Sequence, residues 1–345
     1  MKSYVFPGDI DTRIMEIGSK PFPYMRTDAF SHINKESEQM LLELFHCSGG
    51  KTIIYTGSGT GAMSGIVESY VCTKRKAFVI NGGDFGLRWY ELCHYYGVPA
   101  VNYTVPFARD IDYANLRQRI ADERPDVLLC QHHETSTGQL FNLKELSRIC
   151  REYGISLVVD AISSFLAEPL SMDDLGIDIC VCSTQKGLNI PPGLSIVVIS
   201  KKLEGYPFSH KGFYWDFCTN LGNLSRGQTP YSPATILYLQ LHARLKQIME
   251  EGGENYNIAR VRHRSEFFRS LCAKYDWDIP AEVPSSAITG FQTTDKERKI
   301  FNSLIEKYDT YIMPSSVPGF YRVSHMGLQS DEDLQLLAER IHESE

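Results

Sequence analysis

The sequence between residues 156 and 195, SLVVDAISSFLAEPLSMDDLGIDICVCSTQKGLNIPPGLS, decides the fold of this chain. Residues 156–159 and 177–182 are apolar runs without polar alternation, which predicts two strands of a parallel sheet with both faces buried. The first run ends in Asp160, and Lys186 follows the second. Since ligands of open parallel sheets bind outside the carboxyl ends of the strands, we expect both side chains to emerge on the same side.

An acid and a lysine placed in this way suit pyridoxal 5'-phosphate. The cofactor needs a lysine to hold its aldehyde as a Schiff base and a carboxylate to keep its ring nitrogen protonated. The alternative is that Lys186 is a solvated loop lysine and that Asp160 caps a helix. The segment between the two runs, residues 171–176, has the composition of a short helix.

The motifs DAISSF, STQKG and PPG resemble those of the class V aminotransferases, a family of fold type I pyridoxal phosphate enzymes. The resemblance covers nearly the whole chain, with the motifs in family order. It implies an α/β fold with a mostly parallel central sheet in a large domain and a smaller C-terminal α+β domain. We expect the N-terminal arm and the large domain at residues 1–245 and the small domain at residues 246–345.

The composition is that of an ordinary globular protein. Its 345 residues are 43% apolar, and the formal net charge of −7 argues against nucleic acid or an anionic membrane as a partner. The N-terminal sequence MKSYVFPGDIDT has no signal-peptide core, so we expect the protein in the cytoplasm. The nine cysteines lie mostly in apolar segments and lack zinc spacing, which predicts free thiols and no metal site.

A glycine-rich turn, GSGTG at residues 57–61, joins a predicted strand at residues 51–56 to a helix expected from about residue 62. Backbone N–H groups of such a turn can bind the phosphate of either pyridoxal phosphate or a dinucleotide. A dinucleotide site also needs an acid at the end of the next strand, and Asn81 stands there. The turn resembles the phosphate cup of the aminotransferase family, with Ser58, Gly59 and Thr60 at the matching positions.

Four further positions carry cofactor contacts by resemblance. Phe85, in NGGDFGLR, takes the place of the aromatic residue that stacks on the pyridine ring, and Ile162 would cover the other face. Thr135, in HHETSTG, takes the place of a hydroxyl that reaches the cofactor, although such a turn can also cap its own backbone. Gln185 would lie near the phosphate.

Two segments imply a second chain. Family members use the stretch that corresponds to residues 226–233, RGQTPYSP, to touch the cofactor phosphate of the neighbouring subunit, and Thr229 and Ser232 match those positions. The resemblance therefore implies a homodimer with shared active sites; the alternative is a plain linker. Residues 1–33 predict an extended arm, in which Arg26 could anchor an anionic substrate or pair with a surface acid.

The last third of the chain predicts a smaller α+β layer. It contains GFYRVSHMG, where Arg322 occupies the position of the family's carboxylate-binding arginine. A planar guanidinium can grip a carboxylate at two points, which a lysine cannot do. We also expect a helix at residues 34–47 capped by Asn34, and a long connection, formed by residues 212–217 and 226–233, before a helix that starts near residue 234.

The reaction implied is transfer of an amino group from a small donor to pyruvate or a similar 2-oxo acid. The motifs DAISSF, ETSTG and SAITGF look most like the 2-aminoethylphosphonate–pyruvate branch, whereas STQKGLNIPPG looks more like the alanine or serine–glyoxylate branch. Cysteine desulfurases share the fold but usually carry His before the lysine, where this chain has Gln185. An NAD-type oxidoreductase and a non-catalytic pyridoxal-binding protein stay open as interpretations.

Overall fold

The computed structural model describes residues 1–345. A central sheet contains seven strands, β2 (Lys51–Thr56), β3 (Ala77–Asn81), β4 (Ala100–Thr104), β5 (Val127–Gln131), β8 (Ser156–Asp160), β9 (Ile179–Ser183) and β10 (Leu194–Ile199). Their order is β2-β10-β9-β8-β5-β3-β4, and only β10 runs antiparallel to its neighbours. The mostly parallel sheet is therefore confirmed.

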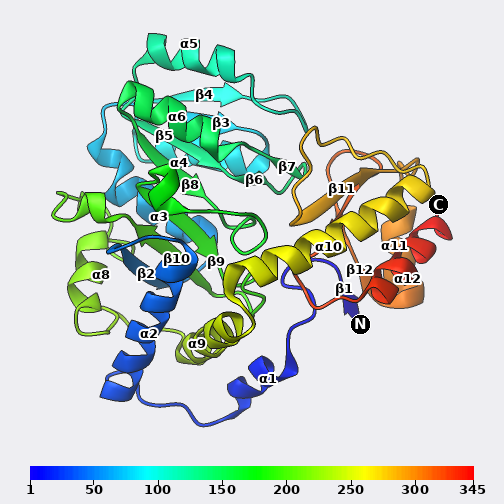
Figure 1. Ribbon diagram of the computed structural model, residues 1–345, viewed down its shortest axis with the longest axis horizontal. Coiled ribbons are helices and arrows are strands. Elements are labelled where there is room, and N and C mark those ends of the chain that lie inside the picture. The colour runs from blue at the N-terminus through cyan, green and yellow to red at the C-terminus, as the bar shows by residue number, and fades with distance from the viewer.

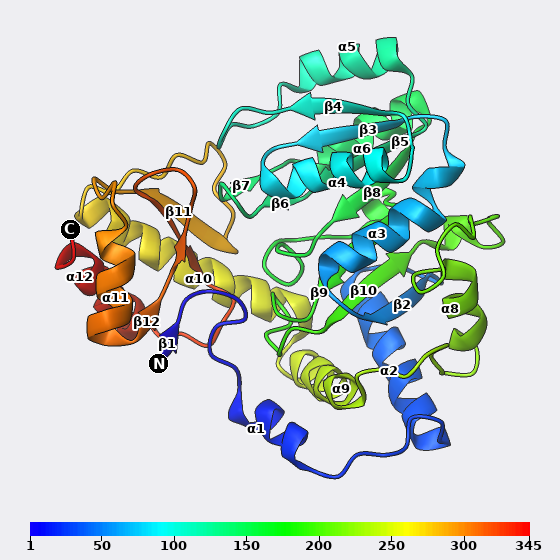
Figure 2. The same cartoon turned by 180° about the vertical axis from the view of Figure 1, so that it is seen from behind.

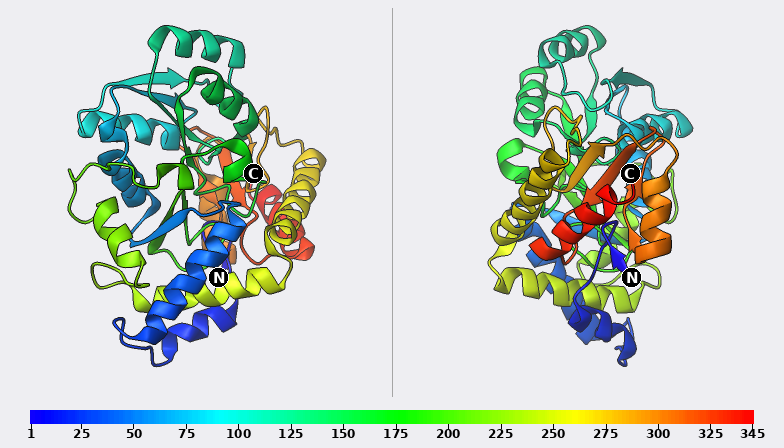
Figure 3. Two further views of the ribbon diagram at one scale, coloured as in Figure 1. Left: turned by 60° about the vertical axis from the view of Figure 1, so that its left-hand side comes forward. Right: turned by 90° about the vertical axis from the view of Figure 1, so that its right-hand side faces the viewer.

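Helices cover both faces of this sheet (Figures 1 and 3). One face packs against α2 (Asp28–Leu44), α5 (Tyr113–Glu123), α6 (Leu143–Tyr153) and α9 (Thr235–Glu250). The other packs against α3 (Gly59–Ser69), α4 (Asp84–Tyr95) and α8 (Phe217–Leu224). Successive strand residues alternate between the two cores, so that Ile54 joins the first core while Ile53 and Tyr55 join the second. This explains why the strands read as continuous apolar runs.

The C-terminal part has its own sheet and its own core of 15 buried residues. Its elements are α10 (Gly253–Lys274), β11 (Ile288–Gln292), α11 (Lys299–Tyr308), β12 (Thr310–Tyr311), β13 (Met313–Pro314), β14 (Phe320–Ser324) and α12 (Asp331–His342). The N-terminus joins this part, because β1 (Lys2–Ser3) pairs in parallel with β12 (Figure 2). The division at residues 245/246 stays a prediction; α9 runs through it, and Gly252 separates α9 from α10.

The remaining elements are short. They are α1 (Thr12–Met15), β6 (His133–Glu134), β7 (Gln139–Leu140), α7 (Met172–Leu175) and the 3-10 helices η1 (Glu16–Ser19), η2 (Val71–Thr73) and η3 (Lys201–Leu203). No helix combines the length and the apolar character that crossing a bilayer would require.

Three local expectations were wrong. Helix α2 begins at Asp28 rather than at Asn34, because the Thr27 hydroxyl accepts the Phe30 N–H and Asn34 is buried inside the helix. The N-terminal arm is partly helical rather than extended throughout, since it contains α1 and η1. Helix α8 lies within the stretch that was expected to be a connection. The Asp216 carboxylate caps this helix by accepting the Thr219 N–H.

The glycines around the start of α3 serve two purposes. A Cβ at Gly57, Gly61 or Gly65 would lie 2.5, 2.7 or 3.0 Å from the Trp215 side chain, so these three glycines admit that ring against the helix. Gly59 differs from them, because it faces the ends of β8 and β9 instead.

We expect Gly61→Ala to lower stability. Overpacking costs about 1–3 kcal/mol, which outweighs the ~0.5–1 kcal/mol that alanine gains over glycine within a helix. Gly222→Ala in α8 is the matched control, because a Cβ there has no neighbour within 4 Å, and it should raise the unfolding midpoint slightly. Thermal unfolding followed by circular dichroism measures both; equal shifts in the two variants would contradict this account of the glycines.

Candidate active site

Asp160 and Lys186 lie at the ends of adjacent parallel strands. Asp160 ends β8 and is paired in register with Val181 of β9, and Lys186 follows β9 by three residues. Both side chains are buried, with 5% and 8% of their surface exposed. The Asp160 Oδ1 accepts the Ile162 N–H at 2.7 Å, whereas its Oδ2 has no hydrogen-bond partner in the chain.

Burial shifts the pKa values of both groups towards their neutral forms. It lowers the pKa of Lys186 to about 7, against an upward effect of Asp160 and a further lowering by Arg322. It raises the pKa of Asp160 to about 7, against the hydrogen bond from Ile162 and the positive charges of Lys186 and Arg88. Because each group shifts the other's pKa, the two share one electrostatic environment.

The backbone after Lys186 passes very close to the backbone after Asp160. A Cβ at Gly187 would lie 2.0 Å from the Phe165 carbonyl oxygen, so no larger residue fits there. A Cβ at Gly59 would lie 2.5 Å from both Ile162 Cδ1 and Ser183 Oγ. Glycine thus keeps open the space between the start of α3 and the two strand ends.

The start of α3 has groups that could hold an anion. Ser58 caps the helix, with its Oγ accepting the Gly61 N–H at 3.3 Å, and the Thr60 Oγ1 accepts a hydrogen bond from Arg88 Nη1 at 3.0 Å. The helix N-terminus and the guanidinium both favour negative charge. Sequence reasoning missed Arg88, since it comes from α4 and reaches Thr60 only in the folded chain.

Glu134 fixes the segment that carries Phe85. Its buried carboxylate accepts the backbone N–H groups of Phe85 and Gly86 at 3.4 and 3.0 Å, and so caps α4. Ser136 donates its hydroxyl to the same carboxylate. Phe85 itself is half-buried, and the Arg88 guanidinium lies 5.1 Å from its ring centroid. We infer that Glu134 positions Phe85, a role that the sequence did not reveal.

Thr135 belongs to a buried hydrogen-bond chain. Its hydroxyl donates to Ser163 Oγ at 2.7 Å, and Ser163 Oγ also contacts His133 Nδ1 at 2.8 Å. Burial lowers the pKa of His133 to about 3, and Lys186 contributes to this lowering, so the imidazole is neutral. The His133 Nε2 is buried without a partner.

Arg322 reaches the same region from β14 in the C-terminal part of the chain. Its Nη1 and Nη2 donate to the carbonyl oxygens of Thr135 and Pro314, each at 2.9 Å, while its Nε is buried without a partner. It forms no salt bridge, and burial lowers its pKa. Arg322 is half-buried, and the nearby carboxylates of Asp84 and Glu134 offset only part of the burial effect on its pKa. A desolvated guanidinium without a salt bridge is consistent with binding of a substrate carboxylate.

The remaining predicted site residues are all partly or fully exposed. Ile162 lies beside Gly59, and Gln185 forms no side-chain hydrogen bond. Arg26 contacts the surface segment that precedes α9, where its Nη1 donates to the Thr229 carbonyl oxygen at 2.5 Å. Thr229 donates to the Tyr231 carbonyl oxygen, and Ser232 is exposed. Arg26, Thr229 and Ser232 form no hydrogen bond to the buried lysine, aspartate or arginine of the same chain.

These groups fit pyridoxal 5'-phosphate. The site offers a carboxylate oxygen without a partner, a buried lysine with a lowered pKa, and a helix start that carries hydroxyls and an arginine. The orphaned Ser183 Oγ, beside the opening that Gly59 leaves, is a further polar atom that a bound group could satisfy. The cysteines offer no comparable nucleophile, because burial raises the pKa of every one of the nine thiols.

Known proteins resemble this chain over nearly its whole length. It is 28% identical over 323 residues to the soluble hydrogenase 42 kDa subunit of Anabaena cylindrica, which covers 90% of this chain and 83% of the relative. It is 24% identical over 298 residues to a 2-aminoethylphosphonate–pyruvate transaminase of Lysinibacillus sphaericus, which covers 84% of this chain and 81% of the relative.

A solved structure shares the fold. The alanine–glyoxylate aminotransferase of a Nostoc species superimposes with a TM-score of 0.90 at 22% identity, and the match covers 99% of this chain and 94% of that one. The family model described as Aminotransferase class-V matches residues 24–220. This overturns the oxidoreductase interpretation, and the chain belongs to the class V aminotransferases.

Proposed function

We propose that the protein is a homodimeric, pyridoxal-phosphate-dependent aminotransferase that transfers the amino group of a small donor to pyruvate or a similar 2-oxo acid. The observation that carries this proposal is the buried pair formed by Lys186 and Asp160, with the half-buried Arg322 close enough to lower the pKa of the lysine. We propose 2-aminoethylphosphonate as the first donor to test, supported by DAISSF, ETSTG and SAITGF, with alanine and serine as the next donors.

The bound cofactor would supply an electron sink for the carbanion formed at the substrate Cα. Ser58, Gly59, Thr60 and Arg88 would hold its phosphate, with Gln185 nearby. Phe85 and Ile162 would flank the ring, and Thr135 would contact it through its hydroxyl network. The Asp160 carboxylate would accept a hydrogen bond from the ring N–H and so keep that nitrogen protonated.

The chain's own residues then handle the substrate. Arg322 binds the carboxylate of a 2-oxo acid through its free Nε and remaining N–H groups, which orients the substrate next to Lys186. Because its pKa is about 7, the Lys186 amine is half neutral near pH 7 and mostly neutral above it, so it can take the proton from the substrate Cα and return it. The hydroxyls of Thr135 and Ser163 are hydrogen-bonded to each other, and His133 is neutral, so these three groups place no charge beside the amine.

We propose that the active site is completed by a second copy of the chain. Arg26 and Thr229 lie together on the surface rather than beside their own Lys186, as expected for groups that serve a partner. We also propose a cytoplasmic location. The nine free cysteines support it, because free thiols are typical of a reducing compartment.

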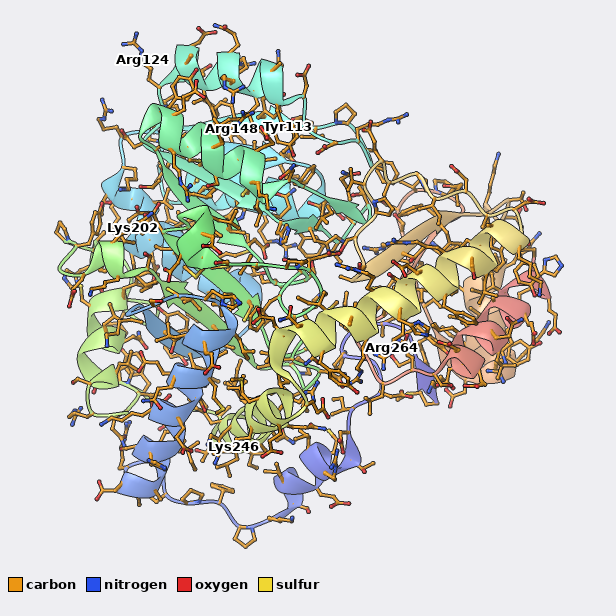
Figure 4. The ribbon with its side chains drawn as sticks, viewed as in Figure 1. Tyr113, Arg124, Arg148, Lys202, Lys246 and Arg264 are labelled. Atoms are coloured by element: carbon orange, nitrogen blue, oxygen red, sulfur yellow. The ribbon has the colours of Figure 1, made fainter.

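Lys186→Ala should abolish transamination. We expect kcat to fall by about a thousandfold or more, since the variant lacks both the attachment point and the proton carrier. Lys202→Ala is the control, because Lys202 is exposed and lies beyond the opposite end of β10 (Figure 4). The assay combines 2-aminoethylphosphonate, alanine and serine with pyruvate and glyoxylate. Turnover by the Lys186 variant with any pair would refute the role of this lysine.

The lowered pKa of Lys186 predicts an unusual pH dependence in the cofactor-free protein. Only the neutral amine reacts with formaldehyde, so reductive methylation of Lys186 should rise with pH with a midpoint near pH 7 and then level off. Because Asp160 raises the pKa of Lys186, Asp160→Asn should move this midpoint to lower pH. Peptide mass spectrometry measures the modification, with the exposed lysines as internal reference. A midpoint near that of these exposed lysines would show that the amine is not desolvated.

Mixing two inactive variants tests the shared site. One carries Lys186→Ala, and the other carries Thr229→Ala with Ser232→Ala. If these hydroxyls serve the partner, a hybrid dimer contains one site with both lysine and hydroxyls intact, and an equal mixture should recover about a quarter of the wild-type activity. If each site uses only its own chain, no activity returns after mixing.

A further inference from the structure

Phe6 lies directly against the candidate catalytic lysine. The Lys186 Nζ is 3.2 Å from the centroid of the Phe6 ring. Phe6 belongs to the segment between β1 and α1, far from Lys186 in sequence, and no motif in the sequence points to it. Its ring also packs against a small cluster that includes Ala167 of the large domain and Ala287, Ile288 and Met326 of the small domain.

The lysine turn itself holds the segment that carries Phe6. The Asn189 N–H bonds to the Lys186 carbonyl oxygen at 2.8 Å, which closes this turn. The Asn189 side-chain amide then donates to the carbonyl oxygens of Pro7 and Asp9 at 2.8 and 3.1 Å. The position of the ring is therefore fixed relative to Lys186 and does not depend on a loose terminus.

The small domain holds the same segment from the other side. The Tyr4 carbonyl oxygen accepts the Ser324 N–H at 2.9 Å, and Ser324 lies two residues beyond Arg322 in β14. A Cβ at Gly8 would lie 2.9 Å from the Gly327 Cα, so the two backbones pass close to each other here. Arg264, labelled on α10 in Figure 4, donates to the Gly327 carbonyl oxygen at 2.7 Å. The segment that carries Phe6 is thus held by the same strand and turn, residues 320–327, that carry Arg322.

We propose that Phe6 determines substrate size, by filling the space beside Lys186 into which a bulky substituent on the reacting carbon would extend. This inference rests on the proposed function. With the substrate carboxylate on Arg322 and the reacting carbon within reach of Lys186, the remaining substituent must share that space with the ring. The site would accept a hydrogen, methyl or hydroxymethyl group and reject longer chains.

The test compares substrates that differ by single methylene groups. In the loaded wild-type enzyme, kcat/KM should fall by about tenfold or more for each methylene added from alanine through 2-aminobutyrate to norvaline. Phe6→Ala should remove most of this fall, and Phe6→Leu should give an intermediate result. Phe22→Ala is the matched control, since Phe22 lies in the same N-terminal segment and is 53% exposed. It should keep the wild-type profile.

A second measurement does not depend on turnover. Calorimetry gives the affinity of the full-length protein for pyruvate, 2-oxobutanoate and 2-oxopentanoate, with and without cofactor. We expect the wild-type protein to prefer pyruvate and Phe6→Ala to lose that preference, while the unfolding midpoint shows that the variant is folded. If Phe6→Ala does not fold, Phe6→Leu decides the question.

Failure of this inference differs from failure of the proposed function. If the wild-type enzyme and both Phe6 variants discriminate equally among chain lengths, Phe6 does not set substrate size, although the enzyme remains an aminotransferase. If the wild-type protein binds the three acids equally well, the inference is likewise overturned. If no donor is turned over, the substrate assignment fails, and the affinities of the acids alone decide the role of Phe6.

Discussion

Desolvation of the Lys186 amine is the constraint on which the site depends. A buried ammonium is costly unless it is paired, and here Asp160 can compensate only part of the positive charge, because Arg322 brings a second cation without a salt bridge. The neutral amine is therefore favoured, which is the form that can accept a proton. The guanidinium groups of Arg88 and Arg322 suit anions such as a phosphate and a carboxylate, although the whole chain carries a net charge of −7.

The sheet brings these groups together because its strand ends are spaced by backbone contacts rather than by side chains. Gly187 lets the lysine turn lie against the chain that follows Asp160, and Gly59 lets the start of α3 approach Ile162 and Ser183. Neither distance can be reached with a Cβ at the glycine. Strand β10 returns antiparallel between β9 and β2, and so places the lysine turn beside the phosphate cup. The strand order thus decides which segments are neighbours at this edge of the sheet, and Gly59 and Gly187 decide how closely their backbones approach.

The sequence was sufficient wherever the signal was local. It predicted strand β2 with both ends correct. Asn34 misled because a polar residue before an apolar helical face looks the same inside a helix as at its start. Phe6, Arg88 and Glu134 could not be found, because each acts on a segment distant in sequence: the ring on Lys186, the guanidinium on Thr60 and the carboxylate on the backbone of Phe85.

The origin of each group indicates how one fold can serve several substrates. The groups proposed for chemistry, Asp160 and Lys186, lie at and just beyond the ends of adjacent strands, where they are buried. Those proposed for selectivity, Phe6 and Arg322, come from the N-terminal segment and the small domain, which are held to each other by β1 and β12. A substitution in the N-terminal segment or in the C-terminal part can change the space beside Lys186 without disturbing the central sheet. That separation accounts for a fold shared at 22% identity with an enzyme named for alanine and glyoxylate.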